Sequence, residues 1–263
     1  MTPRIDPSPP NRLGGVIWPK EHGSWSLALE PVALGLLAAP GAAGVGIAAA
    51  AATGMLLRRP LKLLAGDRSE TRRPETIGAV MVLGLVAAAG VAAAAWLGGP
   101  ERLWPLLLAM PPGLLFLWLD NRGEARAAAA ELAGTAAFAL VPAAIATSAG
   151  WTAGRALALA VIMASRSVPA VVTIRTFLRR RKGQAVSPVP ALAASAAAVL
   201  AAGVVAGTGL GPWVAVAAMA VLFGRAAWLL GRPPVGVSAT RIGVAESVIG
   251  GILVVFLALS WPG

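Results

Sequence analysis

Long runs of uncharged, apolar residues constrain this chain more than any other feature of its sequence. Residues 77–97 contain no Asp, Glu, Lys or Arg and consist mostly of Ala, Val, Leu and Gly. A run of about 20 such residues matches the hydrocarbon core of a bilayer, which is roughly 30 Å thick. The run lacks the alternation of a transmembrane β-strand, and lipid offers the backbone no hydrogen-bond partner. The sequence therefore predicts an all-α, polytopic membrane helical bundle.

The composition excludes several other classes of protein. Of the 263 residues, 57% are hydrophobic and only 13% are charged, which is too apolar for a soluble domain whose helices have wet faces. The chain has no cysteine and one histidine, His22, so disulfides, iron–sulfur clusters and a His-rich zinc site within one chain are excluded. A metal bound by one chain would be held by carboxylates, which makes Mg²⁺ the candidate cofactor.

Nine apolar runs qualify as membrane spans. They are residues 23–39, 42–57, 77–97, 103–119, 127–149, 156–174, 189–205, 212–230 and 242–261. The polar, proline-rich residues 1–22 are interpreted as a flexible cytoplasmic tail, and residues 23–263 as a single transmembrane helical-bundle domain. The first two runs are short and share a tight turn at Pro40 and Gly41, which leaves open that they form a re-entrant hairpin. The orientation of the later spans is the same in either case.

The basic residues supply an independent test of this topology. The net charge of +11 would suggest nucleic acid as a partner of a soluble protein, but in a membrane protein Lys and Arg concentrate in cytoplasmic loops. With nine spans and the N-terminus inside, every Lys and Arg except Arg102 and Arg155 falls on the cytoplasmic side. The pattern predicts an N-in, C-out protein of the bacterial inner membrane. Its expected partners are membrane lipids, and no nucleic acid.

Ionisable side chains inside a span are costly and commonly functional. Glu30 lies eight residues after His22, on a related face of one helix, and Glu131 enters the fifth span. Arg166 lies well inside the sixth span, three residues before Pro169, where a kink would open space. We expect His22, Glu30, Glu131 and Arg166 to line one cytoplasm-facing cavity, as catalytic residues or as a proton or solute path. The alternative is that Glu30 pairs with an arginine to fix helix packing.

An acidic stripe leads into the fifth span. Asp120, Glu124 and Glu131 recur at spacings of four and seven residues, with Asn121 beside the first of them. On a continuous helix these carboxylates would share a face, and converging oxygen atoms suit a hard cation. Asn121 and Glu124 are therefore candidate substrate-binding residues. The alternative is that Asp120 and Glu124 neutralise the arginines of the same solvated loop, and for Asp120 this is the preferred interpretation.

Arginines close the second and the sixth spans. Arg58 and Arg59 follow the second span, and Arg175 and Arg179 follow the sixth, one helical turn apart. Their guanidinium groups could bind a phosphate or diphosphate through forked hydrogen bonds. For the surface run 179–182, anchorage to anionic lipid headgroups is the preferred interpretation.

Glu246 lies near the start of the last span. Small residues recur every four positions beside it, so that helix is expected to pack closely against another. Glu246 would then face protein and pair with an arginine, most simply Arg225 or Arg241, in a structural role.

Several short segments resemble a known family. Residues 19–25 (PKEHGSW) resemble the start of the first helix in the YwiC-like family of small bacterial membrane proteins. Residues 58–61 (RRPL), the stretch 121–131 with its sequel 131–134 (ELAG), and Arg175 with the basic residues after it are further points of likeness. The likeness covers most of the chain.

The predicted architecture is also similar to that of the UbiA superfamily of intramembrane prenyltransferases. Those enzymes have nine helices, N-in and C-out, and hold a prenyl diphosphate through Mg²⁺ on two Asp-rich motifs in the loops after spans two and six. At the first position this chain has Asp67 and Glu70, which the resemblance implies as metal ligands. At the second position it has arginine where aspartate is expected, so the usual two-sided Mg²⁺ clamp cannot form.

The sequence leaves three functions open. The first is a UbiA-like prenyltransferase or lipid-diphosphate binder that takes an isoprenoid or other amphipathic phosphate at its cytoplasmic mouth. The second is a small-solute or proton-coupled transporter, and the third is an assembly factor for a membrane complex. Broken helices and inverted halves would favour transport, whereas a blind chamber under the basic loops would favour transfer chemistry.

Overall fold

The computed structural model describes residues 23–66, 73–124, 127–231 and 238–261, and over these ranges the regular structure is helical, without a strand. The all-α prediction is therefore confirmed. The helices are α2 (Gly23–Ala38), α3 (Ala42–Gly66), α4 (Arg73–Gly98), η1 (Pro100–Leu103), α5 (Trp104–Asn121), α6 (Ala128–Ala139), α7 (Val141–Ser148), α8 (Ala153–Arg181), α9 (Val189–Gly207), α10 (Trp213–Gly231) and α11 (Ala239–Ser260).

Seven stretches of helix among the described residues are long and apolar enough to cross a membrane. They are Arg73–Gly98, Pro100–Asn121, Ala128–Ser148, Ala153–Arg181, Val189–Gly207, Val214–Gly231 and Thr240–Ser260. The first two predicted spans are not among them, because α2 has 16 residues and α3 carries Arg58 and Arg59 in its interior. The chain is a multi-pass membrane protein, while the count of nine spans and their orientation stay predictions.

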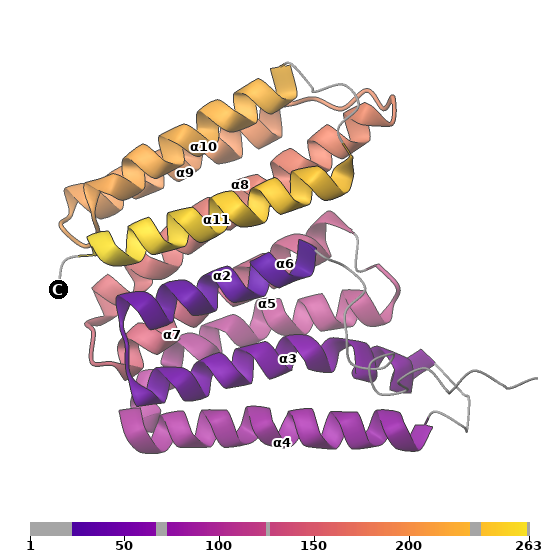
Figure 1. Ribbon diagram of the computed structural model, residues 1–263, viewed down its shortest axis with the longest axis vertical. Coiled ribbons are helices and arrows are strands. Elements are labelled where there is room, and N and C mark those ends of the chain that lie inside the picture. Colours follow the sequence, from indigo (N-terminus) through magenta and orange to yellow (C-terminus); the bar gives the residue numbers. More distant parts are fainter. Residues whose placement is uncertain (1–22, 67–72, 125–126, 232–237, 262–263) are drawn as a thin grey trace, which may run out of the picture.

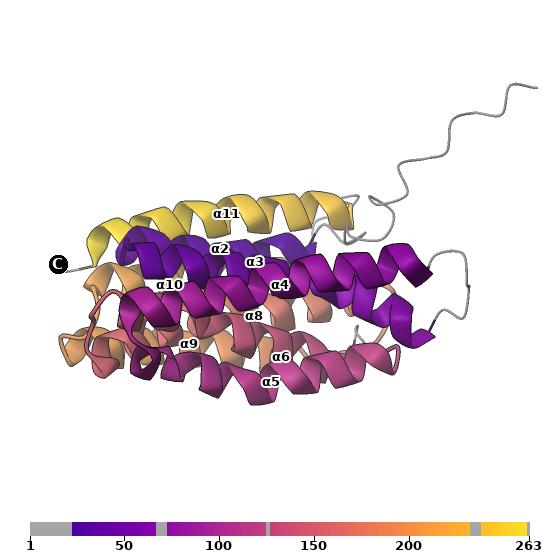
Figure 2. The ribbon, with the colours of Figure 1, turned by 90° about the horizontal axis from the view of Figure 1, so that it is seen from below.

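The helices lie side by side with their long axes along one direction (Figures 1 and 2). In Figure 1, α4 forms one edge of the bundle and α9 with α10 the opposite edge. The C-terminal ends of α3, α5, α8 and α10 gather at one end of the bundle, together with the N-terminal ends of α4 and α11 (Figure 1). We call this the basic end, because its helix termini carry Arg58, Arg59, Lys62, Arg73, Arg122, Arg179, Arg180, Arg181, Lys182 and Arg241.

Prolines lie within several of the helices that cross the bundle, and one span is divided into two helices. Pro142 has no N–H to donate to the preceding turn, and the span that it enters is divided at Leu140 into α6 and α7. Pro31 lies inside α2 and Pro169 lies inside α8, where each removes one backbone hydrogen bond of its helix. Two of these prolines adjoin ionisable side chains: Pro31 follows Glu30, and Pro169 comes three residues after Arg166.

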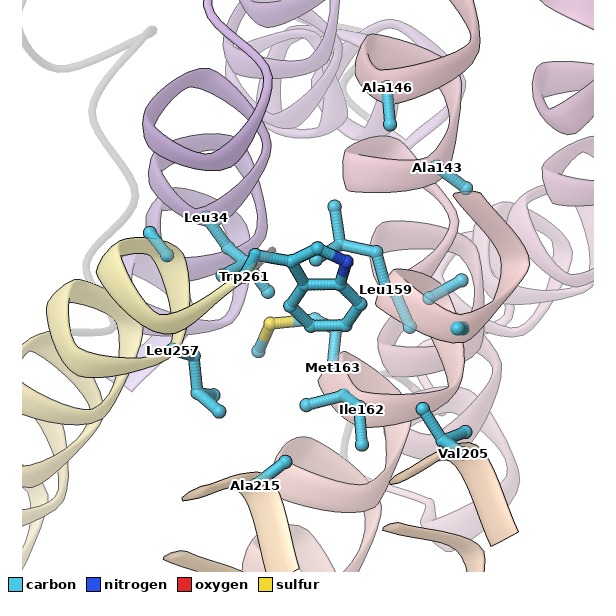
Figure 3. Close-up of a cluster of buried hydrophobic side chains, with 14 of the residues drawn as sticks. Leu34, Ala143, Ala146, Leu159, Ile162, Met163, Val205, Ala215, Leu257 and Trp261 are labelled. Carbon is cyan, nitrogen blue, oxygen red and sulfur yellow. The ribbon is translucent and has the colours of Figure 1, made fainter. Parts of the chain in front are cut away.

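The largest hydrophobic cluster joins α2 to the C-terminal helices, at the end of the bundle opposite the basic end. Figure 3 shows the indole of Trp261 at its centre, and the Trp151 ring lies 6.1 Å away. The surrounding side chains come from seven helices and include Leu34, Ala143, Ala146, Leu159, Ile162, Met163, Val205, Ala215 and Leu257. This core fixes α2 against α7, α8 and α11, and it thereby sets the position of Glu30.

Candidate functional site

Four ionisable side chains from four helices meet inside the bundle. Glu30 is on α2, Arg166 on α8, Arg225 on α10 and Glu246 on α11. Arg166 Nη2 lies 3.5 Å from Glu30 Oε1 and 3.7 Å from Glu246 Oε2, and it donates a hydrogen bond of 3.1 Å to the backbone carbonyl of Glu246. Arg225 Nη1 donates to Glu246 Oε1. We call these four residues the interior cluster.

The interior cluster is largely withdrawn from solvent. The side chains of Glu30 and Arg166 are 9% and 6% exposed, and that of Glu246 is 12% exposed. Two carboxylates and two guanidinium groups balance, so the four residues carry no net formal charge when all are ionised. A buried charge that has lost its partner costs several kcal/mol (about 3–5). Each member of the cluster therefore depends on the others for its place in the bundle.

The cluster lies within the membrane-spanning part of the bundle. Arg166 is close to the middle of the long helix α8. Glu30 and Glu246 each lie about two helical turns inside the basic-end terminus of their helix, which corresponds to about 10 Å at 1.5 Å per residue. Arg166 and the two carboxylates are thus set back from the helix ends, whereas the side chain of Arg225 is 23% exposed.

Hydrogen bonding within the cluster is incomplete. Three of its buried polar atoms, Glu30 Oε1, Glu246 Oε2 and Arg166 Nε, have no hydrogen-bond partner among the described residues. The two carboxylate oxygens lie farther from Arg166 than the usual 2.7–2.9 Å or so of a charge-assisted hydrogen bond. A buried polar atom without a partner costs about 1–3 kcal/mol. The arrangement is thus poorer than a purely structural ion pair would be.

A cavity of about 20 Å³ adjoins the cluster between α8, α9, α10 and α11. Its polar walls come from Ser165, Arg166, Thr173, Ser195, Arg225 and Glu246, and its apolar walls include Met219, Leu222 and Phe223. A space of about 10–15 Å³ is enough for one water molecule. Thr173 Oγ1, in the cavity wall, is another buried polar atom that finds no hydrogen-bond partner in the described part of the chain. The cavity therefore suits a very small polar occupant.

Glu131 belongs to a separate ion pair. Its Oε2 accepts a hydrogen bond of 2.7 Å from Nη1 of Arg175, which joins α6 to α8. Arg166 and Arg175 are nine residues apart, and at 100° per residue they project from opposite faces of α8. The structure thus brings Glu30 and Arg166 together and places Glu131 elsewhere. Whether any of the three is catalytic stays a prediction.

Asp120 corrects one expectation from the sequence. It does not neutralise arginines of a solvated loop: its side chain is 2% exposed, and it joins the end of α5 to α3. Oδ2 accepts from Arg58 Nε at 2.5 Å, and Oδ1 accepts from Lys62 Nζ at 2.8 Å. The Arg58 guanidinium also lies over the Phe116 ring, 4.9 Å from its centroid. We call Arg58, Lys62 and Asp120 the end cluster.

The remaining candidate residues lie at the basic end or outside the described residues. Asn121 and Glu124 are exposed, Arg59 is half-buried, and Arg179 Nε donates to Gln184 Oε1 at 2.8 Å. The sequence candidates that fall outside the described ranges are His22, Asp67 and Glu70. The Mg²⁺ prediction therefore stays open. Within the described ranges, no group of three or more His, Cys, Asp or Glu side chains lies close enough to hold a metal ion.

Glu246 is the cluster member that sequence reasoning undervalued. The expected pairing with Arg225 is found, but Glu246 also approaches Arg166 and so belongs to the interior cluster. The signal was present in the sequence, since a carboxylate within the last span, even near its start, is costly in the same way as Glu30 in the first. The hydroxyl groups of Thr173 and Ser195 carried no comparable signal, because such residues are common in transmembrane helices.

Comparison with known proteins gives one family. A family model described as YwiC-like protein matches residues 18–146. No curated protein and no solved structure matches the chain. The matched residues extend from before α2 into α7, and they include Glu30 and both pairing residues of α5 and α6, Asp120 and Glu131. The interior cluster thus joins one carboxylate from the matched stretch to three side chains that follow it.

Proposed function

Residues 18–146 place this chain in the YwiC-like family, and from that premise we propose that it is a proton-coupled transporter of the bacterial inner membrane. In this proposal the interior cluster takes up and releases the proton. The basic end faces the cytoplasm, because cytoplasmic helix ends carry the excess of Lys and Arg. Among the described residues, Arg102 and Arg155 are the basic side chains at the opposite end.

The observation that carries this proposal is the pair of buried carboxylates that share one arginine. A single nitrogen atom, Nη2 of Arg166, lies within 4 Å of both Glu30 and Glu246, and Arg225 is the nearer cation to Glu246. A proton on Glu30 removes its charge and leaves Arg166 to Glu246, so the ionised and protonated forms of Glu30 give two arrangements of the cluster. Ionisable groups that face the interior of a membrane bundle commonly mark proton relays. The hydrogen-bond donors and acceptors left over in the cluster are those that such an exchange requires.

The prolines support movement near the cluster. Pro31 and Pro169 lie next to Glu30 and one turn from Arg166, and Pro142 separates α6 from α7. Interrupted helices at membrane depth are typical of secondary transporters, in which they place polar groups at a site and allow one part of the bundle to move. The cluster also lies where α2, from the matched stretch, meets the C-terminal helices (Figure 1).

Liposomes that contain the purified protein provide the test. An imposed pH gradient should dissipate faster than in protein-free liposomes, as reported by an enclosed pH-sensitive dye. Glu30→Gln keeps the shape of the side chain but cannot exchange a proton at this position, so it should remove the difference. Glu131→Gln is the matched control, because that carboxylate belongs to a separate pair. Equal rates for the wild type and Glu30→Gln would overturn the proposal.

The second candidate, a lipid-diphosphate binder related to UbiA-like prenyltransferases, is favoured by the last turn of α8. Arg179, Arg180 and Arg181 occupy that turn and Lys182 follows it, all exposed at the basic end. Forked hydrogen bonds from arginine suit phosphate oxygens, but nonspecific attraction to anionic lipid would use the same charges. Prenyl diphosphate binding that falls for Arg175→Lys but not for Arg181→Lys would support the specific site. Equal, negligible effects would leave lipid anchorage.

A further inference from the structure

The cavity beside the interior cluster is rich in hydrogen-bond donors. Two of its walls are guanidinium groups, Arg166 and Arg225, which can only donate. Arg166 Nε and the hydroxyl of Thr173 are buried and have no acceptor among the described residues. Glu246 is the carboxylate in the wall: its Oε1 is engaged by Arg225, and its buried Oε2 has no hydrogen-bond partner among the described residues but lies 3.7 Å from Arg166 Nη2. The donors that remain would be satisfied by an anion.

Charge balance couples the binding of that anion to the protonation of Glu30. With both carboxylates ionised, the interior cluster is neutral, and an anion in the cavity would add an uncompensated buried charge. With a proton on Glu30, the cluster has one positive charge in excess, and an anion restores neutrality. Because isolated charges are so costly at this depth, each ligand should strengthen the binding of the other.

Few charges other than those of the interior cluster lie on the helices around Glu30, so few other groups could respond to its protonation. Of the helices packed against α2, α8 contributes Arg166 and α11 contributes Glu246. The described helix α7 has no ionisable side chain, and Glu131 of α6 is bonded to Arg175. The basic residues of α3 lie toward its basic end, where Arg58 and Lys62 hold Asp120. Protonation of Glu30 is therefore sensed chiefly by Arg166.

We propose that the cavity lined by Arg166, Thr173 and Arg225 binds a small monovalent anion together with a proton on Glu30. This inference rests on the proposed transport function and names its co-transported ligand. The volume of about 20 Å³ restricts the occupant to an ion not much larger than a water molecule, and it excludes a diphosphate. The apolar walls from Met219, Leu222 and Phe223 favour a weakly hydrated anion, for which chloride is the experimental probe.

The experiment titrates chloride into the purified protein in nanodiscs, in gluconate buffer, at several pH values. Binding is followed by calorimetry, and the accompanying proton uptake by a pH-sensitive dye in weakly buffered solution. For the wild type, chloride affinity should rise as the pH falls, and chloride addition should cause proton uptake. Glu30→Gln resembles the protonated acid in charge, so it should bind chloride with an affinity that does not change with pH.

A second pair of variants tests the cavity itself. Thr173→Val removes a buried donor from the wall and should weaken chloride binding while its pH dependence is kept. Thr53→Val is the control, because that hydroxyl is bonded within α3 to the carbonyl of Ala49. Chloride affinity that is independent of pH in the wild type, or that is unchanged in both Glu30→Gln and Thr173→Val, would overturn the inference. Loss of proton movement in Glu30→Gln without any chloride binding would overturn the inference but keep the proposed function.

Discussion

The interior cluster and the end cluster each pair a buried carboxylate with cations, but the two carboxylates differ in how many hydrogen bonds they accept. Both contain a carboxylate that is almost fully buried, Glu30 in one and Asp120 in the other. Asp120 has a cation on each oxygen atom, at 2.5 Å from Arg58 and 2.8 Å from Lys62. Glu30 has Arg166 at 3.5 Å, and its Oε1 has no hydrogen-bond partner in the described part of the bundle. One carboxylate is saturated with donors and the other is not.

The difference follows from depth in the membrane. The end cluster lies at the basic end, where 45% of the Lys62 side chain is exposed and solvent can hydrate the cations. Its role is to join α3 to α5, and a saturated carboxylate serves that role best. In the interior cluster, the Arg166 side chain is only 6% exposed and cannot turn to solvent, so a fixed and saturated arrangement around it would also be difficult to change. The comparison teaches that a buried carboxylate without a full set of donors is free to change its partners, as the proposed proton exchange at Glu30 requires.

The largest effect is expected when Arg166 is removed. Arg166→Met keeps much of the side-chain volume but leaves Glu30 without its cation and Glu246 with Arg225 alone, so the free energy of unfolding should fall by about 3–5 kcal/mol. Thermal unfolding in detergent, followed by circular dichroism, measures the loss. The double variant Arg166→Met/Glu30→Gln should recover part of it, because one unpaired carboxylate is gone.

The control for that substitution lies on the same helix. Arg179 is exposed at the end of α8, and Arg179→Met should leave the unfolding temperature close to that of the wild type. If Arg166→Met were as mild as Arg179→Met, the four charges would not depend on one another.

A smaller loss is expected at the end cluster. Asp120→Ala removes the acceptor of the hydrogen bonds from Arg58 and Lys62, which join α5 to α3, but Arg58 and Lys62 can turn toward solvent. The free energy of unfolding should fall by about 1–3 kcal/mol, again read from thermal unfolding. Glu124→Ala, three residues beyond α5 and exposed, is the control. Proton movement in liposomes should persist in Asp120→Ala, and its loss would assign the end cluster to the proton path as well.

The comparison also separates what the sequence predicts from what it does not. Charge-free runs such as 77–97 predict the helices, because lipid permits no other backbone structure there. The depth of Glu30, Arg166 and Glu246 is predictable too, since it depends only on the distance from a helix end. The contact among these three side chains is not predictable from the sequence. It requires α2 to pack beside α8 and α11, which lie far away along the chain. Pairing across distant helices is decided by tertiary packing.

The direction in which each side chain projects from its helix explains the other differences between the sequence-based expectations and the structure. Arg166 and Arg175 share one helix, and their spacing of nine residues already implies opposite faces, so the separation of Glu131 from the interior cluster was accessible from the sequence. For Asp120, the nearest basic residues along the chain were the wrong partners, because α3 packs against the end of α5 and supplies Arg58 and Lys62. Local neighbours predict an ion pair well only where the chain is solvated.

A third variant displaces the interior carboxylate without removing it. A Cβ at Gly250 of α11 would overlap the carboxylate of Glu30, whereas one at Gly251 would meet nothing within 4 Å. In Gly250→Ala the flexible end of Glu30 must move away from its present position, at a cost of about 1 kcal/mol in stability. The carboxyl band of Glu30 in infrared difference spectra should shift, and proton movement should slow. Gly251→Ala should change neither property, and equal behaviour of the two variants would place the Glu30 carboxylate elsewhere.

The smallest effect is expected at the pair of Glu131 and Arg175, whose carboxylate is more exposed than those of the two clusters. Their side chains are 32% and 29% exposed, so water screens the attraction, and such pairs contribute about 0.2–1 kcal/mol. Glu131→Gln keeps a hydrogen-bond acceptor for Arg175 and should lower the unfolding temperature only slightly. Because the Debye length falls to about 3 Å in 1 M salt, the small difference from the wild type should shrink further there. A loss as large as that of Asp120→Ala, and insensitive to salt, would mean that this pair is sealed from solvent like the interior cluster.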